Sequence, residues 1–177
     1  DFEDKDFTVE CWFNSASDVL AGSGGLITSY HDAHSGWRII HRSASKIVMD
    51  VYGTSNHLEL ENTTSLLTNW HHVAIVRSGT IIYGLIDGIV KDSTTAITIS
   101  AETNGVANQL MIGTNAIDQP SSWEYKGYMD EIAIYSVAKY NPVALPGQAT
   151  ITPGYLDDPS GNHFTTSGLA ITDQMLD

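Results

Sequence analysis

The feature that most constrains this chain is a pair of short apolar runs separated only by Asp87-Gly88. TIIYGLI at residues 80–86 precedes this dipeptide, and IVKDS at residues 89–93 follows it. Asp-Gly favours the positive backbone torsions of a two-residue hairpin turn, so the two runs predict adjacent antiparallel strands. Ser78-Gly79 predicts another tight turn just before them, which joins the run at residues 70–77 to the same hairpin.

Similar short runs recur over the first 135 residues, with clusters of Gly, Asn, Asp and Ser between them. In the run at residues 7–13, alternation places Phe7, Val9, Cys11 and Phe13 on one face. No segment of residues 1–135 has a helical period. We therefore predict an all-β, two-sheet antiparallel β-sandwich with less than about 10% helix. The other runs lie at residues 26–30, 36–42, 46–52, 57–61, 109–114 and 125–135.

The charge of the chain limits its partners. Eight Lys and Arg against 21 Asp and Glu give a formal net charge of -13, which repels nucleic acids and anionic membranes. No apolar run is long enough to span a membrane. The lone Cys11 cannot form an internal disulfide, and its place in an apolar strand indicates a buried side chain.

Three linked blocks carry a resemblance to a known family. They are DFTVECWF (6–13), NWHHVAIVRSGTIIYGLIDGIV (69–90), and QLMIGT (109–114) with YKGYMDEIAIYSVAKY (125–140). Together they resemble the laminin-G-like, concanavalin A-like jelly roll over residues 1–140. The last block is most similar to such modules in virion structural proteins of tailed marine phages.

The resemblance also has implications for the ends of the chain. The family usually begins with one more strand, so we expect a piece of a longer polypeptide and an open sheet edge beside Phe7–Phe13. Residues 141–177 contain no Lys or Arg. We interpret them as an extended strap over the sandwich or a linker to a following domain.

Carboxylates are the first candidate catalytic groups, because the concanavalin A-like fold also includes glycoside hydrolases. A retaining glycosidase needs two carboxyl groups about 5–5.5 Å apart, and the resemblance implies Glu-x-Asp-x-x-Glu on one strand. Glu59-Leu60-Glu61 lacks the third acid, and its alternation indicates a solvated sheet face. Adjacent Asp130 and Glu131 point to opposite faces. No nucleophile-elbow or phosphate-loop motif is present.

The resemblance also implies a structural calcium ion at the rim of the sandwich. Calcium requires six to eight oxygen ligands. The resemblance places Asp130 near such a site, and the candidate partners are Asp87, Asp92, Asp118 and Asn115. The alternative is that these acids cap turns.

Histidines and aromatic residues complete the candidate groups. His31 and His34 are a weak zinc pattern, because such a site needs three or four ligands. One of His71 and His72 is expected in the core. Sugars stack on exposed aromatic rings, and the candidate ligand-binding residues are Tyr30, Trp37, Trp123 and Tyr125.

These observations predict a non-enzymatic binding or structural module of a virion appendage, such as a tail fibre or capsid decoration. It would contact host-surface glycans or a neighbouring viral subunit, as part of a homo-oligomeric assembly. The net charge of -13 favours neutral sugars or a basic protein surface. The alternatives are an extracellular carbohydrate-binding module or glycosidase-associated domain of cellular origin, and a purely architectural spacer.

Overall fold

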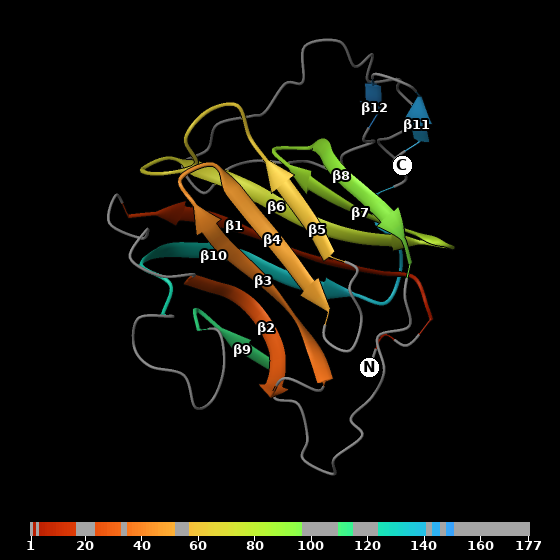
Figure 1. Cartoon of the computed structure of the whole chain (residues 1–177), viewed down its shortest axis with the longest axis horizontal. Helices are drawn as coiled ribbons and strands as arrows, with labels where there is room; N and C mark the ends of the chain where they lie inside the picture. Colours follow the sequence, from red (N-terminus) through yellow and green to blue (C-terminus); the bar gives the residue numbers. More distant parts are fainter. Residues whose placement is uncertain are drawn as a thin grey trace.

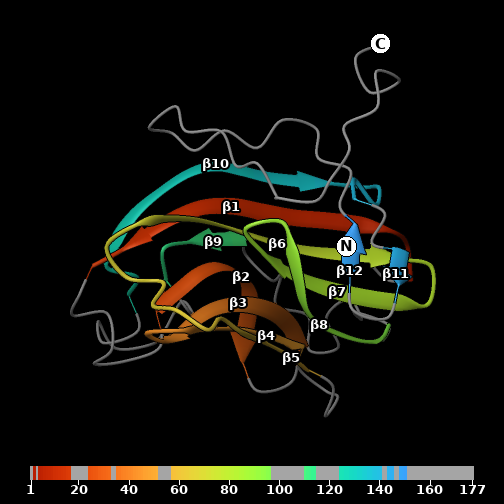
Figure 2. The ribbon, with the colours of Figure 1, turned by 90° about the horizontal axis from the view of Figure 1, so that it is seen from above.

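The computed structural model is a sandwich of two antiparallel five-stranded sheets, which lie as two layers in Figures 1 and 2. It describes residues 2, 4–16, 24–32, 35–51, 57–96, 110–114, 124–140, 143–145 and 148–150. The first layer, here the β1 sheet, has the order β10 (Gly127–Tyr135), β1 (Phe7–Ser15), β6 (Trp70–Ser78), β7 (Ile81–Ile86) and β8 (Ile89–Thr95).

The second layer, here the β3 sheet, has the order β5 (His57–Glu61), β4 (Lys46–Val51), β3 (Ser35–Ser43), β2 (Gly24–Asp32) and β9 (Leu110–Ile112). A separate hairpin joins β11 (Val143–Leu145) to β12 (Gln148–Thr150). The described residues contain no helix, and so none that could cross a membrane. The predicted all-β sandwich is confirmed.

The hairpin predicted at Asp87-Gly88 joins β7 to β8. Asp87 has φ 49° and Gly88 φ 77°, the positive torsions that a two-residue turn of this kind requires. Gly79, with φ 58°, lies in the turn between β6 and β7. Three consecutive strands of the β1 sheet are thus set by local turn chemistry.

The core lies between the sheets and follows the alternation of the strands. The face of β1 that carries Phe7, Val9, Cys11 and Phe13 packs against inward residues of the β3 sheet, all of them buried. The two layers are in close contact at Gly84 of β7, where a Cβ atom would lie 2.6 Å from Leu60 Cδ1. Burial also raises the pKa of the Cys11 thiol, as expected for a packing residue.

A smaller core covers the outer face of the β1 sheet. Tyr140 is buried there against Ala74, Val76, Tyr83 and Leu85. Residues 137–140, which follow β10, are held down by hydrogen bonds to β1. Thr8 Oγ1 donates to Val137 O and accepts from Lys139 N, each at 2.9 Å.

The open edge expected beside Phe7–Phe13 is wrong. β10 pairs with one side of β1 and β6 with the other, so β1 is an inner strand. β10 ends the sheet instead. A bulge interrupts its pairing with β1, and Glu131 lies there with φ 47°.

Candidate functional site

The predicted ligand-binding aromatics lie in different environments. Trp37 is only 5% exposed and packs in the core beside Phe2, at 5.5 Å between ring centroids. The prediction that Trp37 offers an exposed ring to a sugar is therefore wrong, because its strand parity turns the ring between the sheets. Tyr125 is half-buried, and its hydroxyl lies 3.0 Å from Ser15 Oγ. Trp123 and the side chain of Tyr30 lie outside the described residues.

The predicted calcium ligands do not gather into one site among the described residues. Asp87 accepts hydrogen bonds from His71 Nδ1 at 2.7 Å and from the His72 backbone N–H at 2.8 Å. Asp130 accepts one from Glu131 N at 2.8 Å. The register places Asp130 three strand spacings from Asp87, roughly 14 Å, whereas two oxygens on one calcium ion lie within about 5 Å.

The other predicted calcium ligands offer no alternative cluster in the described part of the chain. Asp92 caps Ser93 N and Glu59 N, and Asp118 and Asn115 lie outside the described residues. Nowhere in the described ranges do three His, Cys, Asp or Glu side chains come together as a metal site.

Two inward-facing histidines lie at one end of the core. His41 Nδ1 is 2.7 Å from Ser15 Oγ across the sandwich, and His71 is held by Asp87. Burial, opposed by a hydrogen bond to the Ser43 backbone and reinforced by the nearby His71, lowers the pKa of His41 to about 4. Ser15 and His41 are fully buried, so they cannot attack a substrate in solution.

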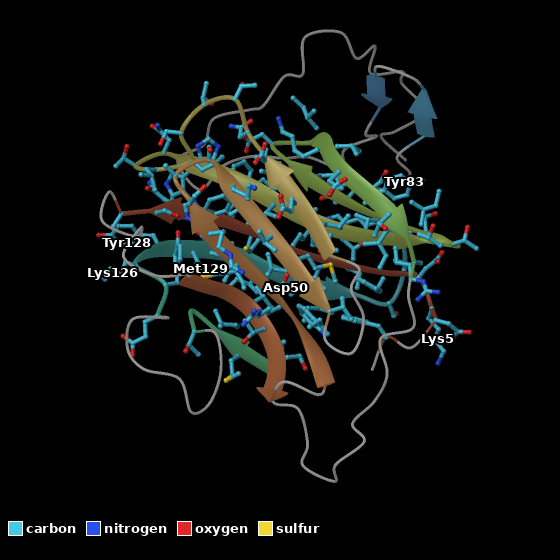
Figure 3. All side chains as sticks on the ribbon, viewed as in Figure 1. Lys5, Asp50, Tyr83, Lys126, Tyr128 and Met129 are labelled. Carbon is cyan, nitrogen blue, oxygen red and sulfur yellow. The ribbon has the colours of Figure 1, made fainter. Side chains whose placement is uncertain are left out.

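A partly exposed cluster of charged side chains lies on the outer face of the β3 sheet. Alternation turns Ile39 and Met49 into the core and their neighbours outward. The register places Arg38 of β3 directly opposite Asp50 of β4, with Thr28 of β2 on the other side of Arg38. Figure 3 shows Asp50 over the middle of this sheet.

Asp50 receives two guanidinium groups on one oxygen. Arg38 donates from Nε at 3.0 Å and from Nη2 at 2.9 Å to Asp50 Oδ2. Arg42 Nη2 lies 3.7 Å from the same oxygen. We call Arg38, Arg42 and Asp50 the arginine triad. Its side chains are 13%, 40% and 21% exposed in that order, so Arg42 is its most accessible member.

An apolar floor lies inside the triad. Ile40 and Val48 pair across β3 and β4 and face outward, yet they are 0% and 3% exposed. Arg42 is four residues along the strand from Arg38, roughly 13 Å, but it reaches the carboxylate opposite Arg38. Its aliphatic stem must therefore lie along the Ile40–Val48 row, which accounts for part of their burial.

Glu59 and Glu61 lie at the β5 edge of the same sheet. Both carboxylates contact Lys46 Nζ, at 2.9 Å and 2.7 Å, and both are exposed. The predicted solvated face is confirmed for these two residues.

The triad combines a carboxylate acceptor with planar, charged donors fixed on a rigid sheet. Such a set binds hydroxyl and carboxylate groups by directed hydrogen bonds. Sequence reasoning missed it. The available signal was the spacing of Arg38 and Arg42 on one strand face, followed across the short Ser43–Ser45 turn by Asp50 on the same face.

Comparison with known proteins identifies the fold. A family model described as the concanavalin A-like lectin/glucanases superfamily matches residues 1–140. No curated protein sequence matches the chain.

Solved structures resemble it at low sequence identity. The CBM40 domain of the Ruminococcus gnavus IT-sialidase, bound to α2,3-sialyllactose, shares 9% identity with a TM-score of 0.62, covering 77% of this chain and 79% of that one. Domain 4 of AbnA, an extracellular GH43 arabinanase of Geobacillus stearothermophilus, in complex with arabinotriose, shares 18% identity with a TM-score of 0.55, covering 77% and 62%. A heptameric SAP-like pentraxin of Limulus polyphemus shares 16% identity with a TM-score of 0.55, covering 76% and 65%.

Proposed function

Since this chain belongs to the concanavalin A-like lectin/glucanases superfamily, we propose that it is a non-catalytic glycan-binding module whose ligand lies on the outer face of the β3 sheet. The observation that carries the proposal is the arginine triad, a fixed carboxylate and two guanidinium groups around an apolar floor. Sugars present hydroxyl groups and apolar ring faces together, and this surface offers a partner for each.

The described residues give no support to glycoside hydrolysis. A general acid must be protonated when the glycosidic bond breaks, and its partner must be ionised. Glu59 and Glu61 both contact the single ammonium group of Lys46 at an exposed edge of the sheet. The two carboxyls thus have the same surroundings, without the division of roles that a pair of catalytic carboxyls needs.

Similar structures support the glycan-binding proposal. The CBM40 domain and the arabinanase domain are each solved with an oligosaccharide. At 9% and 18% identity, these two domains share the fold with this chain. That this chain also binds a glycan is our proposal from that shared fold. The residues that would bind the sugar here are those of the triad.

A glycan array followed by calorimetry of the best ligand tests the proposal. Asp50→Asn removes the shared carboxylate charge and should weaken binding about tenfold or more, since hydrogen bonds to charged groups are the strong ones. Glu61→Gln, on the same sheet outside the triad, should bind as the unchanged protein does. Absence of binding to any glycan would contradict the proposal. Full binding by Asp50→Asn with loss of binding in Trp123→Ala would assign the ligand to Trp123 rather than to the triad.

We also propose, on the sequence resemblance alone, that the module belongs to a virion appendage of a tailed phage and works in multiple copies. A carbohydrate-binding module of cellular origin accounts for the fold and the triad equally well. Antibody labelling of purified phage particles tests the virion location. A structural calcium ion near Asp130 remains a prediction, and thermal melts with and without a chelator test it.

A further inference from the structure

We infer that the side of the sandwich formed by β9 and β10 binds another protein, through a segment that combines apolar side chains with Lys or Arg. We call this surface the β10 side. It is separate from the glycan site proposed above, which lies on the outer face of the β3 sheet.

Core-facing side chains are left exposed on the β10 side. β9 and β10 end the two layers on the same side of the molecule, opposite β5 and β8 (Figure 1). Ile112 of β9 pairs with Ile27, and Ile134 of β10 pairs with Val9, so both face the core side of their sheets. They are nevertheless 52% and 40% exposed. The other exposed apolar residues on these strands or just after β10 are Leu110, Tyr128, Tyr135 and Val137.

The opposite side of the sandwich is closed. Leu58 and Leu60, the core-facing residues of β5, are both buried. Glu59 N donates to the carboxylate of Asp92 on β8 at 2.9 Å, which links the two layers at that side. The exposure on the β10 side is therefore not a general property of the edge strands in this fold.

Two carboxylates interrupt the apolar surface at the middle of β10. Asp130 and Glu131 are both exposed, and Asp130 accepts a hydrogen bond from Glu131 N at 2.8 Å. Neither carboxylate has an ion-pair partner in the described part of the chain. A partner that covered this surface with apolar side chains alone would bury two charges without counter-charges, which is costly.

The cations next to β10 in the chain do not offset these two acids. Lys139 contacts the buried carboxylate of Glu10, and Lys126 is preceded by Glu124, which carries the opposite charge. The two negative charges at the middle of β10 therefore remain for a partner to neutralise.

The neutralising cations have to come from a different protein. All eight Lys and Arg of the chain belong to the described residues, so the remaining segments contain none that could cover Asp130 and Glu131. A second copy would bring the same two acids and a net charge of -13, which opposes pairing. Charge complementarity thus selects a basic partner and rejects this chain itself.

Side chains rather than an added strand make the contact. The bulge at Glu131, where φ is 47°, interrupts the regular pairing of β10. A bulged edge does not accept a strand along its whole length. Apolar side chains of the partner lie over Ile112 and Ile134, and its Lys or Arg pairs with Asp130 and Glu131.

Calorimetry with three synthetic peptides of equal length tests the inference. The first is an amphipathic helix-forming peptide of Leu and Lys, the second has Glu in place of Lys, and the third has Ser in place of Leu. We expect the Leu-Lys peptide to bind about tenfold or more tightly than either of the others at physiological salt, because the surface requires both apolar contact and a counter-charge. Equal binding of the Ser-Lys peptide would reduce the effect to the net charge of -13 and overturn the inference. Equal binding of the Leu-Glu peptide, or no binding of the Leu-Lys peptide, would also overturn it.

Matched charge variants locate the contact. Asp130→Asn combined with Glu131→Gln should weaken binding of the Leu-Lys peptide about tenfold, since interactions with charged groups are the strong ones. Asp4→Asn combined with Glu61→Gln removes the same charge from two exposed acids elsewhere and should change binding by less than about twofold, because distant charges are screened. Equal losses in the two double variants would overturn the assignment to β10.

Matched apolar variants test the other half of the surface. Ile112→Thr should weaken binding of the Leu-Lys peptide, whereas Ile89→Thr, at a residue 50% exposed on β8, should not. If Ile112→Thr lowers the melting temperature, Tyr128→Ser on β10 gives the same comparison at a more exposed position. Binding that is unchanged in these variants, or that falls equally in Ile89→Thr, would contradict a contact at the β10 side.

Discussion

At the scale of single residues, the buried carboxylate of Glu10 holds the end of the domain in place. It accepts hydrogen bonds from Lys139 Nζ and Tyr140 Oη, both at 2.5 Å, and lies 3.6 Å from His72 Nε2. Burial by itself would raise the pKa of Glu10, but these partners outweigh it and lower the pKa to about 2. The ionised form thus ties residues 139–140 to the β1 sheet.

Glu10→Gln should destabilise the domain by about 3 kcal/mol, because it leaves Lys139 without its buried counter-charge. Urea unfolding at pH 7 measures the change. Glu61→Gln, which alters an acid that is 68% exposed, is the matched control and should change the free energy of unfolding by less than about 0.5 kcal/mol. Equal effects of the two substitutions would show that the Glu10 network contributes nothing specific.

His41 gives a separate pH dependence. Its pKa is about 4 in the folded protein, below the ordinary 6.5. The unfolded chain therefore binds this proton first, and the free energy of unfolding falls as pH drops from 6.5 to 4, by about 3 kcal/mol at most. His41→Gln should remove this slope. Glu10 affects stability at lower pH than His41 does, because folding lowers its pKa from 4.5 to about 2. Its contribution to the free energy of unfolding is therefore complete above pH 4.5 and is lost as the pH falls toward 2. An unchanged slope between pH 6.5 and 4 in His41→Gln would contradict the assignment.

At the scale of elements, the packing of β7 on β5 depends on one missing side chain. A Cβ atom on Gly84 would lie 2.6–2.9 Å from three carbon atoms of Leu60, well inside van der Waals contact. Gly84→Ala should cost about 1–3 kcal/mol in unfolding free energy through overpacking.

A double-mutant cycle separates this contact from the loss of glycine itself. Leu60→Ala alone creates a cavity, but Gly84→Ala should be much less harmful in that background, because the added methyl group enters the vacated space. Strictly additive effects of the two substitutions would mean that the sheets do not meet at this pair.

The elements that were predictable from sequence are those set by local rules. The Asp87-Gly88 turn and the parity of β1 follow from torsions and alternation, and both are confirmed. Alternation on β3 places Trp37 on the same face as Ile39 and opposite to Arg38, but which of these two faces lies between the sheets depends on how the layers pack. The pairing of Asp50 with Arg38 and Arg42 needs the register of β3 on β4, which the short turn at Ser43–Ser45 only suggests.

At the scale of the whole molecule, exposed apolar side chains gather at one side of the sandwich. Six of the eight large apolar residues that are exposed in the described part of the chain lie on β9, on β10 or just after it. Figure 3 shows Tyr128 and Met129 at one end of β10. A concentration of exposed apolar side chains on a protein surface indicates a site of contact with another molecule. The six are Leu110, Ile112, Tyr128, Ile134, Tyr135 and Val137.

Charge opposes self-association through this side. β10 ends its sheet, and Asp130 and Glu131 lie at its middle. Two copies that paired antiparallel along β10 about Glu131 would bring these acids face to face, in addition to the repulsion between two chains of charge -13. The bulge at Glu131 further distorts the edge, a device that limits edge-to-edge pairing.

The isolated chain should therefore sediment as a monomer at physiological salt and associate as salt approaches about 1 M, where the Debye length falls to about 3 Å. Glu131→Gln should bring that association to lower salt, because it removes the central repulsion but keeps the apolar side chains. Tyr128→Ser, which changes a residue that is 73% exposed on β10, should suppress the association, whereas Ile89→Ser, at 50% exposed on β8 in the same sheet, should not.

Sedimentation velocity across a salt series measures the association of the native chain and of the three variants. If Ile89→Ser suppressed the association as strongly as Tyr128→Ser, general apolar exposure rather than the β10 side would control it. A Glu131→Gln chain that stayed monomeric at every salt concentration would show that the acids at the middle of β10 are not what keeps the copies apart.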